Sequence, residues 1–189
     1  MLQLVHADVC GPMNTPSITG NRYFLLFVDD FSRKMWVYFL KQKSDAFPVF
    51  QQFKAIVEKE SSSSIRTLRT DNGGEFCSSA FFAFCTTHGI RHQFTTPHTQ
   101  QNGVVECRNR TITEMARAML EHRNVPRKYW AEAVSTAVYL LNRSPTLAVN
   151  HKTPEEAWSG RKPRINHLKV FGSLAYVWIP NAKRTKLNS

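Results

Sequence analysis

Three acidic residues, Asp8, Asp71 and Glu106, each lie in a local sequence that could hold a carboxylate for catalysis. Asp8 follows an apolar, strand-like run in LVHADVCGPM, and Asp71 follows another in RTLRTDNGGEF. Glu106 opens a predicted helix in QQNGVVECRNRTITEMAR. Two aspartates at strand ends and one glutamate on a helix can bind two divalent metal ions, which together stabilise the attacking and leaving oxygens of a phosphodiester. The pattern predicts a metal-dependent phosphoryl-transfer enzyme that acts on nucleic acid.

The ligand types favour Mg²⁺ or Mn²⁺ as the metal. Mg²⁺ is a hard, octahedral ion that proteins hold through a few carboxylates, with water and substrate phosphates completing its coordination. We expect Asp8 and Asp71 to share one ion and Glu106 to hold the second. A single aspartate at a strand end is commonly a turn or capping residue, but three acidic residues in these contexts favour a site.

Composition is consistent with one globular domain and part of a second. The chain has 189 residues, 42% of them hydrophobic, and no apolar run approaches the ~20 residues of a membrane-spanning helix. The N-terminus lacks the pattern of a signal peptide, so we expect an intracellular protein. The four cysteines form no CxxC pair, which favours reduced, mostly buried thiols over disulfides or zinc.

The charge balance points to a polyanionic partner. Lys and Arg number 25 against 14 Asp and Glu, a net charge of +11. A carboxylate site that accepts a phosphate backbone needs basic surroundings, so the excess supports nucleic acid as substrate.

The hydrophobic pattern divides the chain into alternating strands and helices. The order of three strands, helix, strand, helix, strand and further helices predicts a mixed sheet with helices on both faces. Strand ends and the helix starts beside them are where such sheets place their sites. The predicted strands are 2–9, 22–28, 34–40, 65–70, 91–95 and 174–179, and the predicted helices are 44–59, 80–88, 104–122, one from Pro126 to Pro145, and one opening at Thr153.

The helix that carries Glu106 has two distinct faces. At about 100° per residue, Arg110, Thr113 and Arg117 share the side of Glu106, where DNA could lie. We expect the arginines to contact phosphates, which adds affinity more than sequence preference; a solvated helix face is the alternative for Arg117. Apolar residues on the other side should pack on the sheet, namely Val105, Ile112, Met115, Ala116 and Met119.

Two polar segments flank these carboxylates. Gln101 and Asn102 could bond to nucleic acid from a mobile loop, 97–103, although a plain polar loop would look similar. The glycines after Asp71 predict a tight turn, in which Glu75 has a structural role. Asp29 and Asp30 are predicted to form the hairpin turn between the second and third strands.

The segments quoted above, together with RYFLLFVDDFSRKMWVYFL, WAEAVSTAVYLLNRSPT and HLKVFGSLAYVWIP, resemble the integrase region of copia-type LTR retrotransposon polyproteins. The resemblance covers almost the whole chain. It implies a ribonuclease-H-like fold, a mixed five-stranded sheet flanked by helices. It implies an Asp, Asp, Glu triad at Asp8, Asp71 and Glu106, with Asn102 and Arg110 as DNA-contacting neighbours. It further implies 3′-end processing and strand transfer of element DNA into a chromosome, and hence action in the nucleus, and dimers are common in this fold family.

Three departures from that family pattern bear on activity. The loop contains TPHTQQNG where the family usually has TPHTPQQNG, and Cys107 and Arg108 replace two basic residues. We expect residues 1–165 to form the catalytic core and residues 166–189 to begin a small, incomplete β domain with a basic tail. With no upstream His/Cys domain in the chain, a fragment or decayed element copy is the expectation.

Three alternatives to an active integrase core stay open at this point. One is an inactive nucleic-acid-binding remnant, which the shortened loop favours and the intact triad disfavours. Another is a nuclease of the same fold that cuts RNA in hybrids, which the segments QQNGVVE and DNGGEF make less favourable. The last is a pseudogene product that does not fold.

Overall fold

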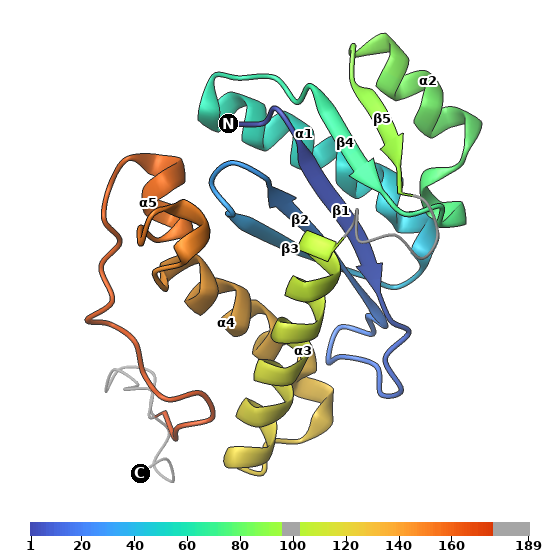
Figure 1. The fold of residues 1–189 in the computed structure, drawn as a ribbon. Coiled ribbons are helices and arrows are strands. Elements are labelled where there is room, and N and C mark those ends of the chain that lie inside the picture. The colour runs from blue at the N-terminus through green and yellow to red at the C-terminus, as the bar shows by residue number, and fades with distance from the viewer. Residues whose placement is uncertain (96–102, 176–189) are drawn as a thin grey trace, which may run out of the picture.

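One mixed sheet organises the chain, and a computed structural model describes it over residues 1–95 and 103–175. The strand order is β3–β2–β1–β4–β5 (Figure 1). β1 pairs antiparallel with β2, and β2 with β3, whereas β1–β4 and β4–β5 are parallel. This confirms the predicted mixed five-stranded sheet. The strands are β1 (Val5–Cys10), β2 (Tyr23–Asp29), β3 (Met35–Leu40), β4 (Thr67–Thr70) and β5 (Arg91–Phe94).

The helices follow the sequence expectation closely. They are α1 (Ala46–Ser61), α2 (Ser79–Thr87), α3 (Gly103–His122), α4 (Trp130–Arg143) and α5 (Pro154–Ser159). Short 3₁₀ turns η1 (Lys43–Asp45) and η4 (Arg127–Tyr129) lead into α1 and α4, and η2 (Gly74–Phe76) and η5 (Leu147–Val149) lie between elements.

The helix starts show where local chemistry was predicted well and where it was not. Thr153 caps α5 as predicted, because its Oγ1 accepts a hydrogen bond from the Glu156 N–H at 3.0 Å. The cap of α2 is Ser78, since the Ser78 Oγ accepts from the Phe81 N–H at 3.2 Å, so the helix begins at Ser79, one residue before the predicted range 80–88. Two adjacent serines offer the same chemistry, and the register of the helix selects the first.

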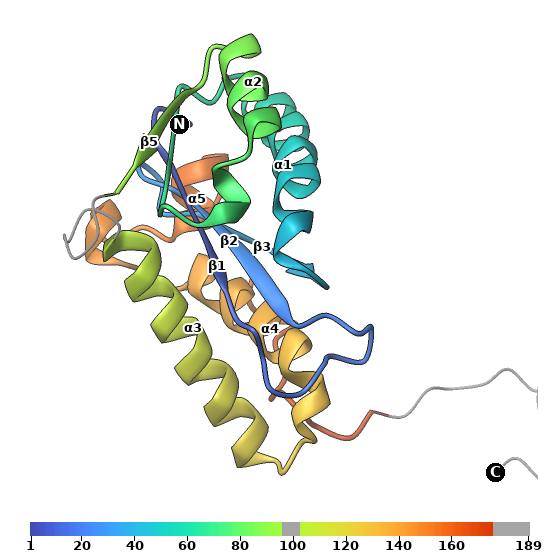
Figure 2. The ribbon, with the colours of Figure 1, turned by 90° about the vertical axis from the view of Figure 1, so that its right-hand side faces the viewer.

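Two apolar layers cover the two faces of the sheet. α1 and α2 pack on one face and α3 and α4 on the other, and Figure 2 shows α1 and α3 on opposite sides. β2 is buried on both faces, and its residues alternate between the two layers. Leu25 and Phe27 belong to the α1 layer, and Phe24, Leu26 and Val28 to the α3 layer.

Connecting segments match several of the expectations. Asp29 stabilises the predicted hairpin turn, because its carboxylate accepts from the Ser32 N–H at 2.8 Å and from the Leu2 N–H at 2.8 Å. All four cysteines are free thiols, but Cys77 and Cys107 are exposed, contrary to the expectation of mostly buried thiols. Neither Leu174 nor Ala175 is in a strand, and the rest of predicted strand 174–179 lies outside the described residues.

Within the described ranges, no helix has both the length and the apolarity that crossing a membrane requires.

Phe53 is the central aromatic residue of the α1 layer. Its ring is fully buried and stacks on Phe27 with centroids 4.0 Å apart, and Trp36 meets it edge-on at 5.4 Å. We predict that Phe53→Ala lowers the free energy of unfolding by about 3–5 kcal/mol in urea denaturation, because it leaves a cavity in a close-packed core. Phe31→Ala, at a ring that is 66% exposed, should change it by less than about 0.5 kcal/mol. Equal losses in both variants would contradict this core assignment.

Candidate active site

The parallel pairing of β1 with β4 brings Asp8 and Asp71 together. The paired residues are Val5 with Leu68 and His6 with Arg69, so the same register continued by two residues sets Asp8 beside Asp71. β4 ends at Thr70, whereas β1 continues to Cys10 because β2 still pairs with it. Asp8 therefore lies inside β1, two residues after the last β1 residue that pairs with β4. The sequence had suggested that it lies at the end of the strand.

α3 holds the other side of the site through a buried amide. The apolar side of α3 packs on the sheet as predicted, with Val105, Ile112 and Ala116 buried. Asn109 is buried on that same side, and its Nδ2 donates a 2.7 Å hydrogen bond to the Asp8 Oδ2. This hydrogen bond links α3 to β1 directly at the Asp8 carboxylate.

The pKa of Asp8 reflects its burial and the charged groups around it. Burial raises the pKa of Asp8 from the ordinary 3.8 to about 6, with further upward contributions from the charges of Asp71 and Glu106. The Asn109 hydrogen bond opposes this rise. An aspartate among other carboxylates is a site where a divalent cation would relieve repulsion, and three hard oxygen donors suit Mg²⁺ or Mn²⁺.

Asp71 begins a tight turn in which Gly73 lies close to two carboxylates. Its Oδ1 accepts from the Gly73 N–H at 3.0 Å. A Cβ on Gly73 would lie 2.9 Å from that Oδ1 and 2.8 Å from the Glu75 carboxylate, so a side chain there would displace an acidic group. Glu75 pairs with the Lys43 Nζ at 3.4 Å, in line with the structural role predicted for it.

Two hydrogen bonds through the Thr70 hydroxyl link the backbone of Asp71 to His92 on β5. The Thr70 hydroxyl donates to the Asp71 backbone carbonyl at 2.8 Å, and its oxygen lies 3.0 Å from the His92 Nε2. Because the Thr70 hydroxyl proton is already donated to the Asp71 carbonyl, the His92 Nε2–H must donate to the Thr70 oxygen. Burial lowers the pKa of His92 to about 4, which keeps the ring neutral. The end of β4 is thereby fixed to β5.

Glu106 is in the first turn of α3, and its side chain is exposed. Across residues 1–95 and 103–175, no three His, Cys, Asp or Glu side chains are close enough to hold a metal ion together. The predicted three-carboxylate ligand set is therefore only partly formed. Asp8 and Asp71 are adjacent, whereas Glu106 acts on Asp8 through its charge. An exposed carboxylate gains more from water than from two like charges.

The α3 side chains that were predicted to face DNA form an exposed row. Glu106, Arg110, Thr113 and Arg117 are all exposed. The buried side chains of α3 lie about 60–120° round the helix axis from Glu106. Arg110, Thr113 and Arg117 also border a cavity of about 250 Å³ that contains Asn109 in its wall. The row of arginines therefore begins next to the aspartates.

Some predicted residues cannot be placed, and others were missed. Gln101 and Asn102, with the loop that carries the deletion, lie outside the described residues. Asn109, Thr70 and His92 were not predicted as site residues. The spacing of Asn109, three residues after Glu106, was a usable signal, because at about 100° per residue it sets Asn109 about 60° round the helix from Glu106, next to the face of α3 that packs on the sheet. No local pattern marked His92.

Comparison with known proteins agrees with this architecture. The integrase core domain family matches residues 1–100. The chain is 50% identical, over its whole length, to the Retrovirus-related Pol polyprotein from transposon TNT 1-94 of Nicotiana tabacum. It is 41% identical over 98% of its length to that from transposon RE2 of Arabidopsis thaliana. The chain spans only 14% and 13% of these two relatives.

Solved structures show the same fold. The HTLV-2 integrase catalytic core domain in complex with magnesium matches 83% of the chain and 96% of that domain, with a TM-score of 0.60 at 22% identity. A chain of the simian T-cell lymphotropic virus intasome matches the whole length, and 65% of its own, with a TM-score of 0.66 at 23% identity. The protein belongs to the integrase core domain family. It is similar to a region of retrotransposon Pol polyproteins, which confirms the resemblance seen in the sequence.

The raised pKa of Asp8 makes stability depend on pH. Between about pH 4 and 6 the native carboxyl keeps a proton that an unfolded aspartate has lost, so Asp8 makes the protein less stable as the pH rises through this window. We predict that Asp8→Asn stabilises the protein by roughly 1–3 kcal/mol at pH 7.5 and hardly at all at pH 4, in urea denaturation. Glu60→Gln, at an exposed position of α1, is the control for the removal of one negative charge. The same gain at both pH values would refute this electrostatic account.

Proposed function

We propose that this chain is the catalytic core of a metal-dependent DNA integrase, which processes the 3′ ends of retrotransposon DNA and transfers the strands into a chromosome. The observation that supports this most is the parallel β1–β4 register, which, continued by two residues, sets Asp8 beside Asp71. Asn109 of α3 donates to the Asp8 carboxylate there, and the charge of Glu106 acts on it. Of the two similar structures, the HTLV-2 core is a complex with magnesium and the other belongs to an intasome.

Asp8, Asp71 and Glu106 would hold the Mg²⁺ or Mn²⁺ ions. When bound, such ions polarise phosphoryl oxygens and generate a nucleophile from water or a 3′-hydroxyl. Asn109 keeps the Asp8 carboxylate oriented, and the His92–Thr70 chain keeps the end of β4 in place.

The positive residues of α3 would bind the DNA backbone. Arg110 and Arg117 present guanidinium groups on the side of Glu106, which suits phosphates. Gln101 and Asn102, which precede α3 in the sequence, would bind the same DNA. A homodimer, action in the nucleus, and the division into a core at 1–165 and a further domain from 166 stay predictions.

We predict that Glu106→Gln abolishes Mn²⁺-dependent cleavage or joining of a short labelled duplex, lowering product by at least about 100-fold. DNA affinity should change by less than about twofold, because the substitution leaves the basic row intact. Glu132→Gln is the matched control, since Glu132 is also an exposed glutamate in the first turn of a helix, α4. Product that persists in Glu106→Gln would contradict the proposed site. DNA binding by the wild type without any metal-dependent product would identify an inactive remnant.

If Arg110 and Arg117 bind phosphates, removing either one should weaken the salt dependence of DNA affinity. Arg110→Gln and Arg117→Gln should each reduce the slope of log affinity against log salt concentration by about 1, because each removes one phosphate contact. Arg66→Gln, at an exposed position before β4, should leave the slope unchanged. An equal change in all three variants would show that net charge, and not this face of α3, determines DNA binding.

A further inference from the structure

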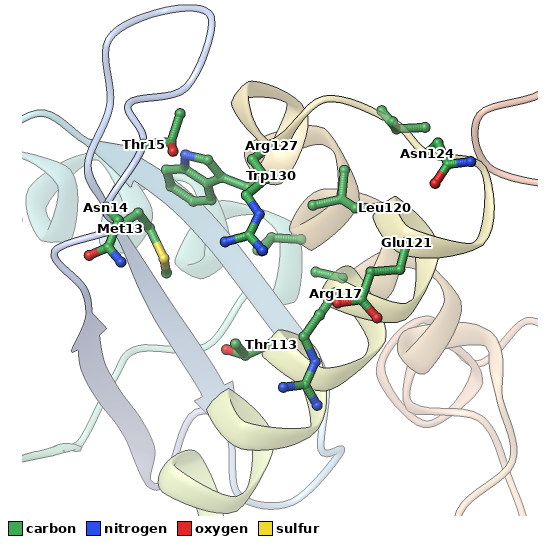
Figure 3. Close-up of a pocket in the computed structure, with 13 residues that line it drawn as sticks. Met13, Asn14, Thr15, Thr113, Arg117, Leu120, Glu121, Asn124, Arg127 and Trp130 are labelled. Carbon is green, nitrogen blue, oxygen red and sulfur yellow. The ribbon is translucent and has the colours of Figure 1, made fainter.

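A second and larger cavity lies beyond the arginines of α3. Its volume is about 500 Å³, within the range of sites for small ligands. Three segments enclose it, namely the loop after β1 at Met13–Thr15, the second half of α3, and the turn into α4 with the first turns of that helix (Figure 3). No residue of the proposed carboxylate site borders this cavity.

The cavity has an apolar floor and a polar rim in which two arginines outnumber one glutamate. Trp130, Ala116 and Val134 are buried at its floor. The exposed guanidinium groups of Arg117 and Arg127 border it, and among the described residues Glu121 is the one acidic residue in its lining. The amides of Asn14 and Asn124 also face it. An apolar wall, amides and two guanidinium groups match the three parts of a nucleotide, which are a base face, a base edge and a phosphate.

The cavity is continuous with the DNA-facing row of α3. Arg117 and Thr113 line both this cavity and the smaller one next to Asn109. Arg117 is eleven residues after Glu106 on one helix, a rise of about 16 Å along its axis. At 3.4 Å per nucleotide along a strand, that distance corresponds to about five nucleotides.

We propose that this cavity binds one unpaired nucleotide of the DNA substrate, about five nucleotides from the reacting phosphodiester, with its base against Trp130 and Leu120 and its phosphate between Arg117 and Arg127. The proposal rests on the function proposed above, because it requires DNA along α3. An unpaired nucleotide is the favoured occupant, since extruding a paired base costs a few kcal/mol of stacking and pairing.

The test compares two labelled DNAs by fluorescence anisotropy, one fully paired and one of the same sequence with a single unpaired nucleotide. The position of that nucleotide is varied from the second to the eighth from the end. We expect the wild type to bind the second DNA about tenfold more tightly, which is the size of one base–aromatic contact, with a maximum near the fifth position. Equal affinity for the two DNAs at every position would overturn the proposal.

Two variants and one control locate the effect. Leu120→Trp fills the cavity and should abolish the preference while leaving affinity for paired DNA within about twofold, which also verifies that the variant folds. Arg127→Gln removes a phosphate ligand from the surface and should reduce the preference without a core change. Lys128→Gln removes the same charge from the adjacent exposed residue, outside the lining, and should retain the preference. A preference that survives in both Leu120→Trp and Arg127→Gln would place the unpaired nucleotide elsewhere.

The outcomes separate this proposal from the integrase function. If the wild type binds paired DNA and gives metal-dependent product but shows no preference, only the nucleotide cavity is refuted. If it binds neither DNA, both are refuted.

Discussion

The parallel register between β1 and β4 is the constraint on which the rest of the site depends. It sets Asp8 beside Asp71 although 62 residues separate them in the sequence. A shift of one residue would turn one of the two carboxylates to the opposite face of the sheet, because side chains alternate along a strand. β2 enforces the register indirectly, since it pairs with the whole of β1 and is buried on both faces.

The position of α3 is the second requirement, and a buried hydrogen bond defines it more sharply than apolar packing could. Val105, Ile112 and Ala116 set which side of α3 meets the sheet, but apolar contacts tolerate sliding. The hydrogen bond from Asn109 to Asp8 forms at only one position of α3 along its axis. Any other position would leave the buried Asp8 without this donor, and its carboxyl would be still harder to ionise. Glu106 and the arginines take their places from that position.

The site retains unfavourable electrostatics inside a well-packed fold. The raised pKa of Asp8 shows that burial and neighbouring carboxylates disfavour its charge. The unfavourable electrostatics are confined to the α3 face of the sheet, beside the C-terminal end of β4. The aromatic layer around Phe53, and the Trp36–Trp158 pair with ring centroids 4.8 Å apart, stabilise the opposite face. Such a division is common where a protein keeps strained groups for function.

The sequence by itself determined the elements and the faces of α3, because hydrophobic period, turn residues and capping chemistry are local. The strands, the row from Glu106 to Arg117 and the Thr153 cap all followed from it. Only the tertiary structure decided which strand pairs with β1, that Asp8 lies within β1, and that Asn109, Thr70 and His92 support the aspartates. It also decided that Glu106 faces solvent instead of completing a ligand cluster among the described residues, and that a cavity opens between α3 and the loop after β1. These features depend on register and packing between distant segments, which no local pattern encodes.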